Sequence, residues 1–569
     1  MINRRQLLKT LTATGIGSAV FHRAIIALVT QEEKKITKAA LQQAAWVTDM
    51  ELSDADADTI LANVQKASGS FKRLRKIELT ADVGPASHFA PLRGFRRSAN
   101  APPTVESVSR NAVPIEFVAG ALPESDDEIA FLPVAELSAL VRDRKITSRR
   151  LTEIYLQRIK KYGPMLRCVV TVTEELAKEQ AERADKEIEA GVYRGPLHGI
   201  PWAAKDLVDV PGYPTSWGIP FYKDRVVDNL ATVASRLESA GAVLVAKASM
   251  GALAMGDKWF EGKTRNPWNP NRGSSGSSAG SASGTVAGLF GFSIGTETLG
   301  SITSPSKVCG ATGFRPTFGR VSRHGCMPLS WTMDKIGPIC RSAEDCALVF
   351  DAIHGEDGKD PTAQNYRFQW PPRIETRGLK VGYTTRRRDV ENRPDLQLMK
   401  ELGCELVEVK LPKKIPAREL AATIDIEAAS VFDSLLRDGE TDGWNAWPNI
   451  FRSAQYISAI DYLRIMRLRT VLMHEFEMMM SGVDLLCNVF DIFHTNLTGH
   501  PSIVIPRGYN DLKAEYAKRP LHITLTGQLD EDATVLLVAR ACQQKLDAHL
   551  KRPALEQWLK KFKANELDD

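Results

Sequence analysis

Serine and glycine alternate through one segment of the chain, and this segment contains the first candidates for catalysis. Residues 273–284 consist of glycine, serine and alanine, and residues 295–301 end in Gly300 and Ser301. A serine hydroxyl can attack a carbonyl carbon, but only when a neighbouring base accepts its proton. The chemistry on offer is therefore acyl transfer, provided that the fold buries this segment beside a base.

Two other interpretations of the segment remain open. Residues 273–284 alone have the composition of a flexible linker. A linker, however, would not lie between apolar segments such as Leu289–Phe292 and Cys309–Phe314. Gly276–Gly280 also fits the G-x-S-x-G pattern of an α/β-hydrolase-type esterase, with Ser278 as the nucleophile. That pattern must follow a buried strand, and the segment before it is turn-rich, so we consider it the weaker interpretation.

Four blocks of the chain resemble the amidase signature family in order, spacing and chemistry. They are Gly195–Asp206, Asn266–Ser277, Gly295–Ser301 and Cys309–Arg323. Two later segments, Asn496–Pro506 and Gly527–Leu529, resemble the closing strands of that family. The resemblance extends over residues 131–550 and is far more specific than any single short pattern.

The resemblance implies three catalytic side chains. The relay lysine of the family falls on Lys205, its bridging serine on Ser277 and its nucleophilic serine on Ser301. A lysine can accept a proton only when it is neutral, and burial among apolar neighbours lowers its pKa from ~10.4 toward that condition. Ser277 would take the proton of Ser301 while it passes its own to Lys205.

The resemblance also implies two backbone features. One is a cis peptide bond between Gly276 and Ser277, a path that glycine makes feasible. The other is an oxyanion hole made of consecutive backbone N–H groups, whose donors are worth about 3 to 4 kcal/mol each. The resemblance assigns these donors to the backbone N–H groups of Thr298, Leu299, Gly300 and Ser301.

Two departures from the family pattern lie in this loop. The usual Asp-Thr-Gly-Gly-Ser is replaced by Glu297-Thr-Leu-Gly-Ser, and Thr303 stands where the family commonly has arginine. We therefore expect the loop to be supported differently. Leu299 must also occupy a backbone angle that leucine tolerates. The implied catalytic positions are intact, so the departures bear on substrate and rate rather than on reaction class.

Other chemistry-bearing residues have weaker signals. Met255, Trp259 and Phe260 are predicted to line the acyl pocket, although ordinary core packing fits them equally well. His198 lies near Lys205 and is interpreted as structural. The eight cysteines and ten histidines are scattered, without a metal-ligand spacing, so we expect no metal and no cofactor.

The elements that must position these residues indicate an α/β protein. Apolar patterns predict helices over Val134–Tyr162 and 173–190, and strand-like segments over Ile200–Val210 and Ala242–Ala246. Their alternation is typical of a layered α/β fold. The family resemblance further implies a mixed, twisted central sheet covered by helices on both faces. Helix-like spacing over residues 32–76 predicts an N-terminal helical appendage outside it.

Four regions follow from these patterns. We predict an export signal over residues 1–30, a helical appendage over 31–77, a proline-rich linker or arm over 78–130 and the catalytic domain over 131–560. The first region carries Arg4-Arg5 before a weakly apolar stretch, which resembles a twin-arginine signal. It predicts an exported or periplasmic protein. A basic helix that stays attached, in a cytoplasmic protein, is the alternative.

Composition excludes several partners. The net charge of +5, from 74 basic and 69 acidic residues, is too small to predict a nucleic-acid surface. Beyond the leader, no apolar run is long enough for a stable membrane span. A small-molecule amide is therefore the expected partner, and a homo-oligomer is also compatible with the sequence.

The leading hypothesis is an amidase, a hydrolase that cleaves a carboxamide C–N bond through an acyl-enzyme on Ser301. The alternative is the glutamine-hydrolysing subunit of a tRNA-dependent amidotransferase, which uses the same three side chains. The export-like leader and the long N-terminal arm favour the first.

Overall fold

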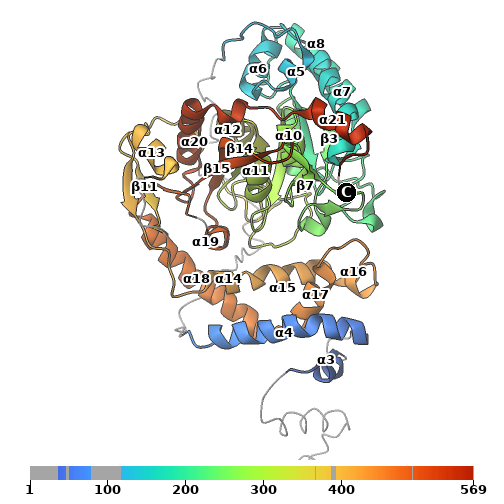
Figure 1. The fold of residues 1–569 in the computed structure, drawn as a ribbon, viewed down its shortest axis with the longest axis vertical. Coiled ribbons are helices and arrows are strands. Elements are labelled where there is room, and N and C mark those ends of the chain that lie inside the picture. The colour runs from blue at the N-terminus through green and yellow to red at the C-terminus, as the bar shows by residue number, and fades with distance from the viewer. Residues whose placement is uncertain are drawn as a thin grey trace, which may run out of the picture.

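The computed structural model describes residues 36–45, 50–77, 117–365, 367–385, 392–489 and 491–567. The predicted export signal and most of the predicted linker lie outside these ranges. The described residues form a large mixed sheet with helices on both sides and a layer of helices beyond one end (Figure 1). This architecture confirms the α/β prediction.

Eleven strands make up the central sheet. In spatial order they are β1 (Val169–Val172), β3 (Val243–Ala248), β2 (Pro201–Lys205), β8 (Phe292–Glu297), β10 (Lys335–Cys340), β9 (Thr312–Arg315), β14 (Ser502–Asp511), β15 (Lys518–Gly527), β13 (Leu485–Cys487), β11 (Lys380–Tyr383) and β12 (Glu405–Glu408). Two small hairpins pair β4 (Lys258–Trp259) with β5 (Gly262–Lys263) and β6 (Arg265–Asn266) with β7 (Asn269–Gly273).

Strand β2 lies in the interior of the sheet and is buried along its whole length. It runs parallel to both β3 and β8, and its Trp202 stands beside Phe292 of β8 in a stacked arrangement. Alternate side chains of a strand point to opposite faces: Trp202 packs into one hydrophobic cluster and Ala203 into another. Both faces of β2 are therefore covered, and its carboxyl end reaches the same edge of the sheet as that of β8.

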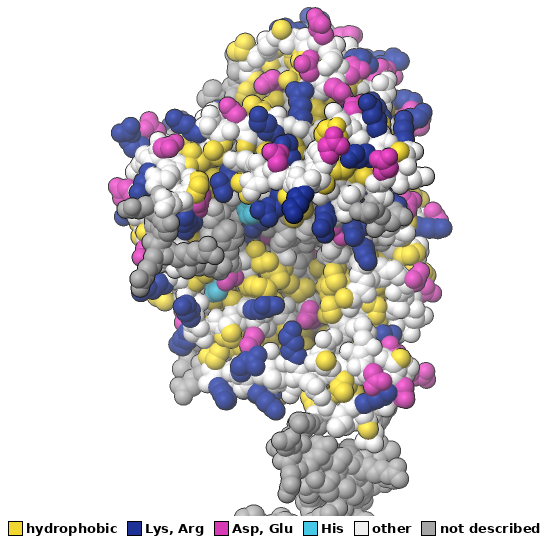
Figure 2. Space-filling view, viewed as in Figure 1, with side chains coloured by type: hydrophobic (Ala, Val, Ile, Leu, Met, Phe, Trp, Pro, Cys, Tyr) yellow, Lys and Arg dark blue, Asp and Glu magenta, His cyan; other side chains and the backbone are white. Residues whose placement is uncertain are grey.

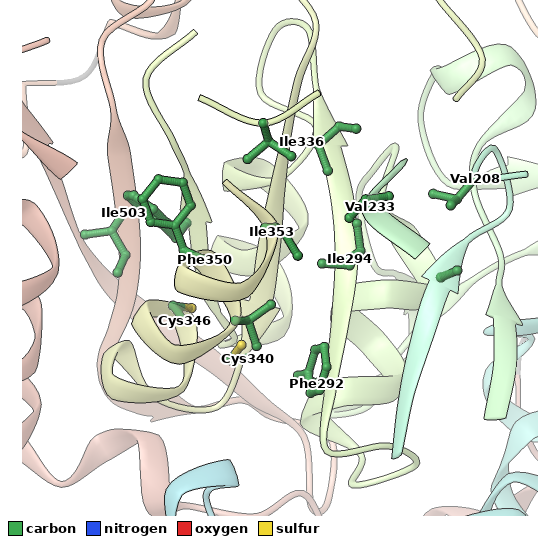
Figure 3. Close-up of a cluster of buried hydrophobic side chains, with 14 of the residues drawn as sticks. Val208, Val233, Phe292, Ile294, Ile336, Cys340, Cys346, Phe350, Ile353 and Ile503 are labelled. Atoms are coloured by element: carbon green, nitrogen blue, oxygen red, sulfur yellow. The ribbon is translucent and has the colours of Figure 1, made fainter. Parts of the chain in front are cut away.

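The helices of the catalytic domain cover both faces of the sheet. They are α5 (Asp126–Ala130), α6 (Val134–Arg142), α7 (Ser148–Leu166), α8 (Glu174–Glu189), α9 (Thr232–Ser239), α10 (Ala279–Val286), α11 (Thr303–Cys309), α12 (Ala343–Ile353), α13 (Pro394–Glu401), α19 (Ile492–Thr498), α20 (Asp532–Leu546) and α21 (Leu555–Lys563). Figure 3 shows Phe350 and Ile353 of α12 in a buried apolar cluster with Ile336 of β10.

Five helices form a layer that we call the cap, residues 417–480. They are α14 (Ala417–Leu420), α15 (Ala422–Val431), α16 (Asp433–Arg437), α17 (Trp447–Ala454) and α18 (Ala459–Met480). The cap lies beyond the end of the sheet domain, next to α19 (Figure 1). Trp447 joins it to the sheet domain, because its Nε1 donates to the Leu253 carbonyl at 2.9 Å.

Two N-terminal helices, α3 (Lys38–Ala45) and α4 (Asp54–Leu74), lie on the outer side of the cap (Figure 1). Ser53 caps α4 by accepting the Asp56 N–H. At the other end of α4, Arg75 donates to the buried carboxylate of Asp461 in α18. The N-terminal helices therefore pack onto the cap rather than forming a body of their own. None of the described helices has the length and apolarity that a membrane span requires.

Candidate active site

Lys205 stands at the carboxyl end of β2 and is completely buried. Its Nζ donates to the Ser277 Oγ at 2.8 Å and to the Thr296 Oγ1 at 2.9 Å. The adjacent carboxylate of Asp206 is engaged elsewhere, since it pairs with the buried Lys247 at 3.1 Å and accepts from the Ser216 N–H at 3.0 Å. The amine of Lys205 is therefore held by hydroxyl groups rather than by a charge.

This environment favours the neutral form of the lysine. Burial lowers the pKa of Lys205 to about 7, and the more distant carboxylates of Asp334 and Glu297 offset only part of that effect. A lysine with such a pKa can accept a proton near neutral pH, which an ordinary surface lysine cannot do.

Ser277 lies between β7 and α10, in a loop that is packed too tightly for a side chain at the preceding residue. A Cβ at Gly276 would lie 1.8 Å from the Gly256 carbonyl oxygen. The peptide bond between Gly276 and Ser277 is cis, as the family resemblance implies. Ser277 is itself buried and is directly bonded to Lys205.

Ser278 connects the loop to its neighbours. Its hydroxyl donates to the Thr296 carbonyl and accepts from the Thr296 N–H, both at 3.1 Å. Its backbone N–H donates to the Ser301 carbonyl at 3.1 Å. The strand before it, β7, belongs to a separate hairpin and not to the central sheet. This is not the strand-to-helix elbow that an α/β-hydrolase nucleophile requires.

Ser301 follows β8 in the loop that leads to α11 and is 9% exposed. In this loop Gly300 takes the positive φ, at 90°, which leaves Leu299 outside the left-handed region. The replacement of a family glycine by Leu299 is thus accommodated, and its side chain packs against the main hydrophobic core.

Glu297 clamps the start of α11 from inside the protein. One carboxylate oxygen accepts from the N–H groups of Ile302 and Thr303, at 2.9 and 2.8 Å, and from the Thr303 hydroxyl at 3.0 Å. The other accepts from Arg315 at 2.7 Å and from Asn496 at 3.0 Å. The two residues that differ from the family pattern, Glu297 and Thr303, are therefore hydrogen-bonded to each other next to Ser301.

The hydrogen-bond and ion-pair partners of Glu297 keep its carboxyl group ionised. Burial alone would raise the pKa of this carboxyl, but Arg315 and the Thr303 N–H outweigh it and hold the pKa at about 2. Sequence reasoning missed Thr296, Arg315 and Asn496. Arg315 and Asn496 lie within blocks that carry the family resemblance, but their partners are far away in the chain.

Asp334 holds the loop from the opposite side. It accepts from the Thr298 hydroxyl at 2.6 Å, and from the N–H groups of Leu329 and Ser330 at 2.8 and 2.9 Å. Burial raises the pKa of Asp334 and lowers that of the neighbouring Lys335 well below its usual value. Neither residue was predicted from the sequence.

A cavity of about 630 Å³ reaches this region. Its lining includes Thr296, the buried Thr298 and three residues that we call the wall residues, Leu329, Trp331 and Thr332. Trp331 is 48% exposed and marks the solvent end of the cavity, whereas Thr298 marks the inner end. In Figure 2, apolar side chains gather across the middle of the molecule, between the sheet domain and the cap. The three side chains of the predicted relay do not themselves line the cavity, which meets the relay at Thr296.

The residues predicted for the acyl pocket follow Ala254 in the chain. Ala254 lines the cavity, whereas Met255, Trp259 and Phe260 are not among its lining residues. The Trp259 Nε1 donates to the Arg167 carbonyl at 3.2 Å, and its ring packs edge-on against Phe260.

His198 has a structural environment. It is buried, its Nδ1 accepts from the Arg194 N–H at 3.1 Å, and its Nε2 lies 3.0 Å from Glu187. Burial lowers the pKa of this imidazole. Among the described residues, no group of three or more histidine, cysteine, aspartate or glutamate side chains is arranged to hold a metal ion.

The fold has counterparts among solved structures. The peptide amidase of Stenotrophomonas maltophilia is 26% identical, with a TM-score of 0.65 over 74% of this chain and 98% of that one. A bacterial aryl acylamidase, at 23% identity and a TM-score of 0.66, shares the fold over 75% of this chain and all of its own. The fold and the site thus define an amide-hydrolysing enzyme.

Sequence comparison gives the family. Residues 150–488 match the amidase family, and the chain belongs to it. A glutamyl-tRNA(Gln) amidotransferase subunit of Chloroflexus aurantiacus is 31% identical over 491 residues, which cover 75% of this chain and 99% of the relative. The corresponding protein of Coxiella burnetii is 30% identical over 488 residues, which cover 74% and 99%.

The clamp on the Ser301 loop can be tested with Glu297→Gln. The amide keeps the shape of the side chain but leaves the buried Arg315 without a counter-charge, and breaking a buried pair in this way costs about 3–5 kcal/mol. We expect a clear fall in Tm, and a fall in kcat of about tenfold or more as the loop loosens. Thermal unfolding and steady-state kinetics measure both.

A matched control is Glu238→Gln, which removes the charge from the solvent-exposed Glu238–Arg183 pair. Such pairs contribute about 0–1 kcal/mol, so Tm and kcat should stay near their original values. Equal effects of the two substitutions would contradict a special role for Glu297.

Proposed function

We propose that Ser301 is the nucleophile of this amidase, that Ser277 bridges and that Lys205 is the base. The observation that carries the proposal is the 2.8 Å hydrogen bond between the buried Lys205 amine and the Ser277 hydroxyl. Ser301 follows β8, the strand next to that lysine in the sheet. The low pKa of Lys205 supplies a base at neutral pH.

The reaction begins when Ser301 Oγ attacks the carbonyl carbon of a carboxamide. Its proton passes to Ser277, whose own proton passes to Lys205. Negative charge develops on the carbonyl oxygen, and the backbone N–H groups of residues 298–301 are proposed to bind it. The ammonium of Lys205 then returns a proton through Ser277 to the leaving nitrogen. Ammonia or an amine departs, and the acyl group remains on Ser301 as an ester.

Water completes the cycle. It attacks the ester carbonyl while the same relay accepts its proton, the acid is released and Ser301 is restored. We propose that the cavity lined by Thr296 and Thr298 receives the acyl part of the substrate. Met255, Trp259 and Phe260 do not line this cavity, and their place in the acyl pocket stays a prediction. A small-molecule amide is the substrate class that this arrangement supports.

A second candidate is the ammonia-producing component of an amidotransferase. It is favoured by the relatives at 30 and 31% identity, which are named as parts of such an enzyme and are covered almost completely. Purified chain that hydrolyses glutamine and is recovered in a stable complex with other proteins would support it. Release of ammonia from simple carboxamides by the isolated chain supports the stand-alone amidase.

The nucleophile is tested by labelling with a fluorophosphonate, which reacts with activated serines. We expect mass mapping to find the adduct on Ser301, and Ser301→Ala to abolish both labelling and hydrolysis. Ser277→Ala and Lys205→Met should each lower kcat by about 10³-fold or more, because the relay acts as a unit.

Ser278→Ala separates this proposal from the α/β-hydrolase alternative. Ser278 lies next to the bridging serine but is bound to Thr296, so its loss should disturb the loop and leave measurable labelling on Ser301. An adduct on Ser278, or none in folded protein, would contradict the assignment.

The pH dependence follows from the buried lysine. Below the pKa of about 7 the amine of Lys205 is protonated and cannot act as a base. We expect kcat/KM to fall tenfold per pH unit below that value and to reach a plateau above it. Measuring kcat/KM between pH 5 and 9 tests this expectation, and a profile that is flat through pH 7 would contradict it.

We also propose that the leader directs export by the twin-arginine route, supported by Arg4-Arg5 before the apolar stretch. Replacing both arginines with lysine should leave the protein in the cytoplasm of a twin-arginine-competent host, as measured by cell fractionation. Equal distribution of the two forms would argue for the alternative, a basic helix that stays attached.

A further inference from the structure

A buried carboxylate in the cap holds one wall of the cavity. Glu427 belongs to α15, and its side chain faces the loop of the wall residues. One carboxylate oxygen accepts from the Ser330 hydroxyl at 2.6 Å and from the Thr332 N–H at 3.2 Å. The other accepts from the hydroxyls of Thr332 and Tyr462, both at 2.9 Å. Four donors on one buried carboxylate make a strong attachment.

The same loop is fixed at its other side to the proposed oxyanion loop. Asp334 accepts from the N–H groups of Leu329 and Ser330 and from the Thr298 hydroxyl. Arg469 of α18 adds a third attachment, since it donates to the Thr332 hydroxyl and carbonyl at 2.8 Å each. The wall residues are therefore placed jointly by the sheet domain and the cap.

The size of the cavity indicates how the position of the wall residues would affect substrate binding. At about 630 Å³, the cavity falls in the range of sites that hold drug-sized molecules, far more than an acetyl group fills. A short acyl group would occupy the inner end, at Thr296 and Thr298. Leu329 shares Asp334 with Thr298 and lies near that end, whereas only a long acyl group would reach Trp331, which is 48% exposed at the solvent end of the wall.

We propose that Glu427 is a positioning residue that sets the preference of this amidase for long acyl groups. It acts through the wall residues and does not touch the reacting atoms. The inference rests on the proposed function in one respect, namely that the cavity receives the acyl part of the substrate.

The test compares a short and a long primary amide, acetamide and 4-phenylbutanamide, in the full chain. For Glu427→Ala we expect KM for 4-phenylbutanamide to rise about tenfold, while kcat/KM for acetamide stays within about twofold. Ser330→Ala removes one of the four donors and should change KM in the same direction by a smaller factor.

Glu427→Gln is the conservative variant. Its carbonyl oxygen can still accept, and the hydroxyls of Thr332 and Tyr462 can turn to accept from its amide group. It should therefore recover most of the affinity for 4-phenylbutanamide. The matched control is Asp433→Ala in α16, where the lost carboxylate binds Arg437 and Gln455, both inside the cap. This control weakens the cap without touching the wall.

Two results would overturn the proposal. One is an equal loss for both amides in Glu427→Ala, and the other is the same selective rise in KM in Asp433→Ala; either would mean that Glu427 only stabilises the cap. If Glu427→Ala does not fold, Ser330→Ala decides by the same criterion.

Failure of the proposed function is detected separately. Binding of 4-phenylbutanamide to Ser301→Ala, measured by calorimetry, requires no catalysis. A tenfold rise in Kd on adding Glu427→Ala supports the role of Glu427 even if Ser301 proves not to be the nucleophile. An unchanged Kd contradicts that role even if Ser301 is labelled.

Discussion

A desolvated amine is the constraint on which the rest of this structure depends. Within the described part of the chain, the Lys205 amine hydrogen-bonds to the hydroxyls of Ser277 and Thr296 and pairs with no carboxylate. The next residue in the chain, Asp206, would raise the pKa of the lysine if its carboxylate turned toward Lys205, since an opposite charge favours the charged form. The buried Lys247 prevents this by occupying Asp206. The two buried lysines lie on adjacent parallel strands and have different partners, which are hydroxyl groups for Lys205 and a carboxylate for Lys247.

The surrounding residues hold the Ser301 loop in place although Glu297 and Thr303 differ from the family pattern. Glu297 is one methylene longer than the aspartate expected from the family pattern, and it meets two backbone N–H groups of the first turn of α11. That position also suits a negative charge, because helix N-termini carry partial positive charge. The guanidinium comes from Arg315 on β9 instead of from position 303. The same loop is attached to Asp334 through Thr298, so two buried acids fix it from opposite sides.

Local pattern and family resemblance predicted the catalytic domain well. Periodicity placed helices over Val134–Tyr162, where the structure has α6 and α7, and a strand over Ala242–Ala246, where it has β3. The resemblance anticipated the contact of Lys205 with Ser277 and the cis peptide. Contacts between segments that are distant in the chain could not be predicted from the sequence. The partners of Glu427 lie 35 to 97 positions away, and no periodicity records such pairing. The predicted pocket residues were chosen for their apolar character, a property that core residues share.

The attachment of α4 to the cap has a consequence for how the chain is made. Arg75 and Asp461 are separated by 386 positions, so α4 leaves the ribosome long before Asp461 is made. During that interval Phe71 and Leu74 of α4, which pack into the main hydrophobic core, lack most of the surface that covers them in the finished molecule. Contacts that span so much sequence close slowly. Helix α4 is therefore made early but reaches its native place late, which leaves a long interval in which a chaperone could bind its apolar side chains.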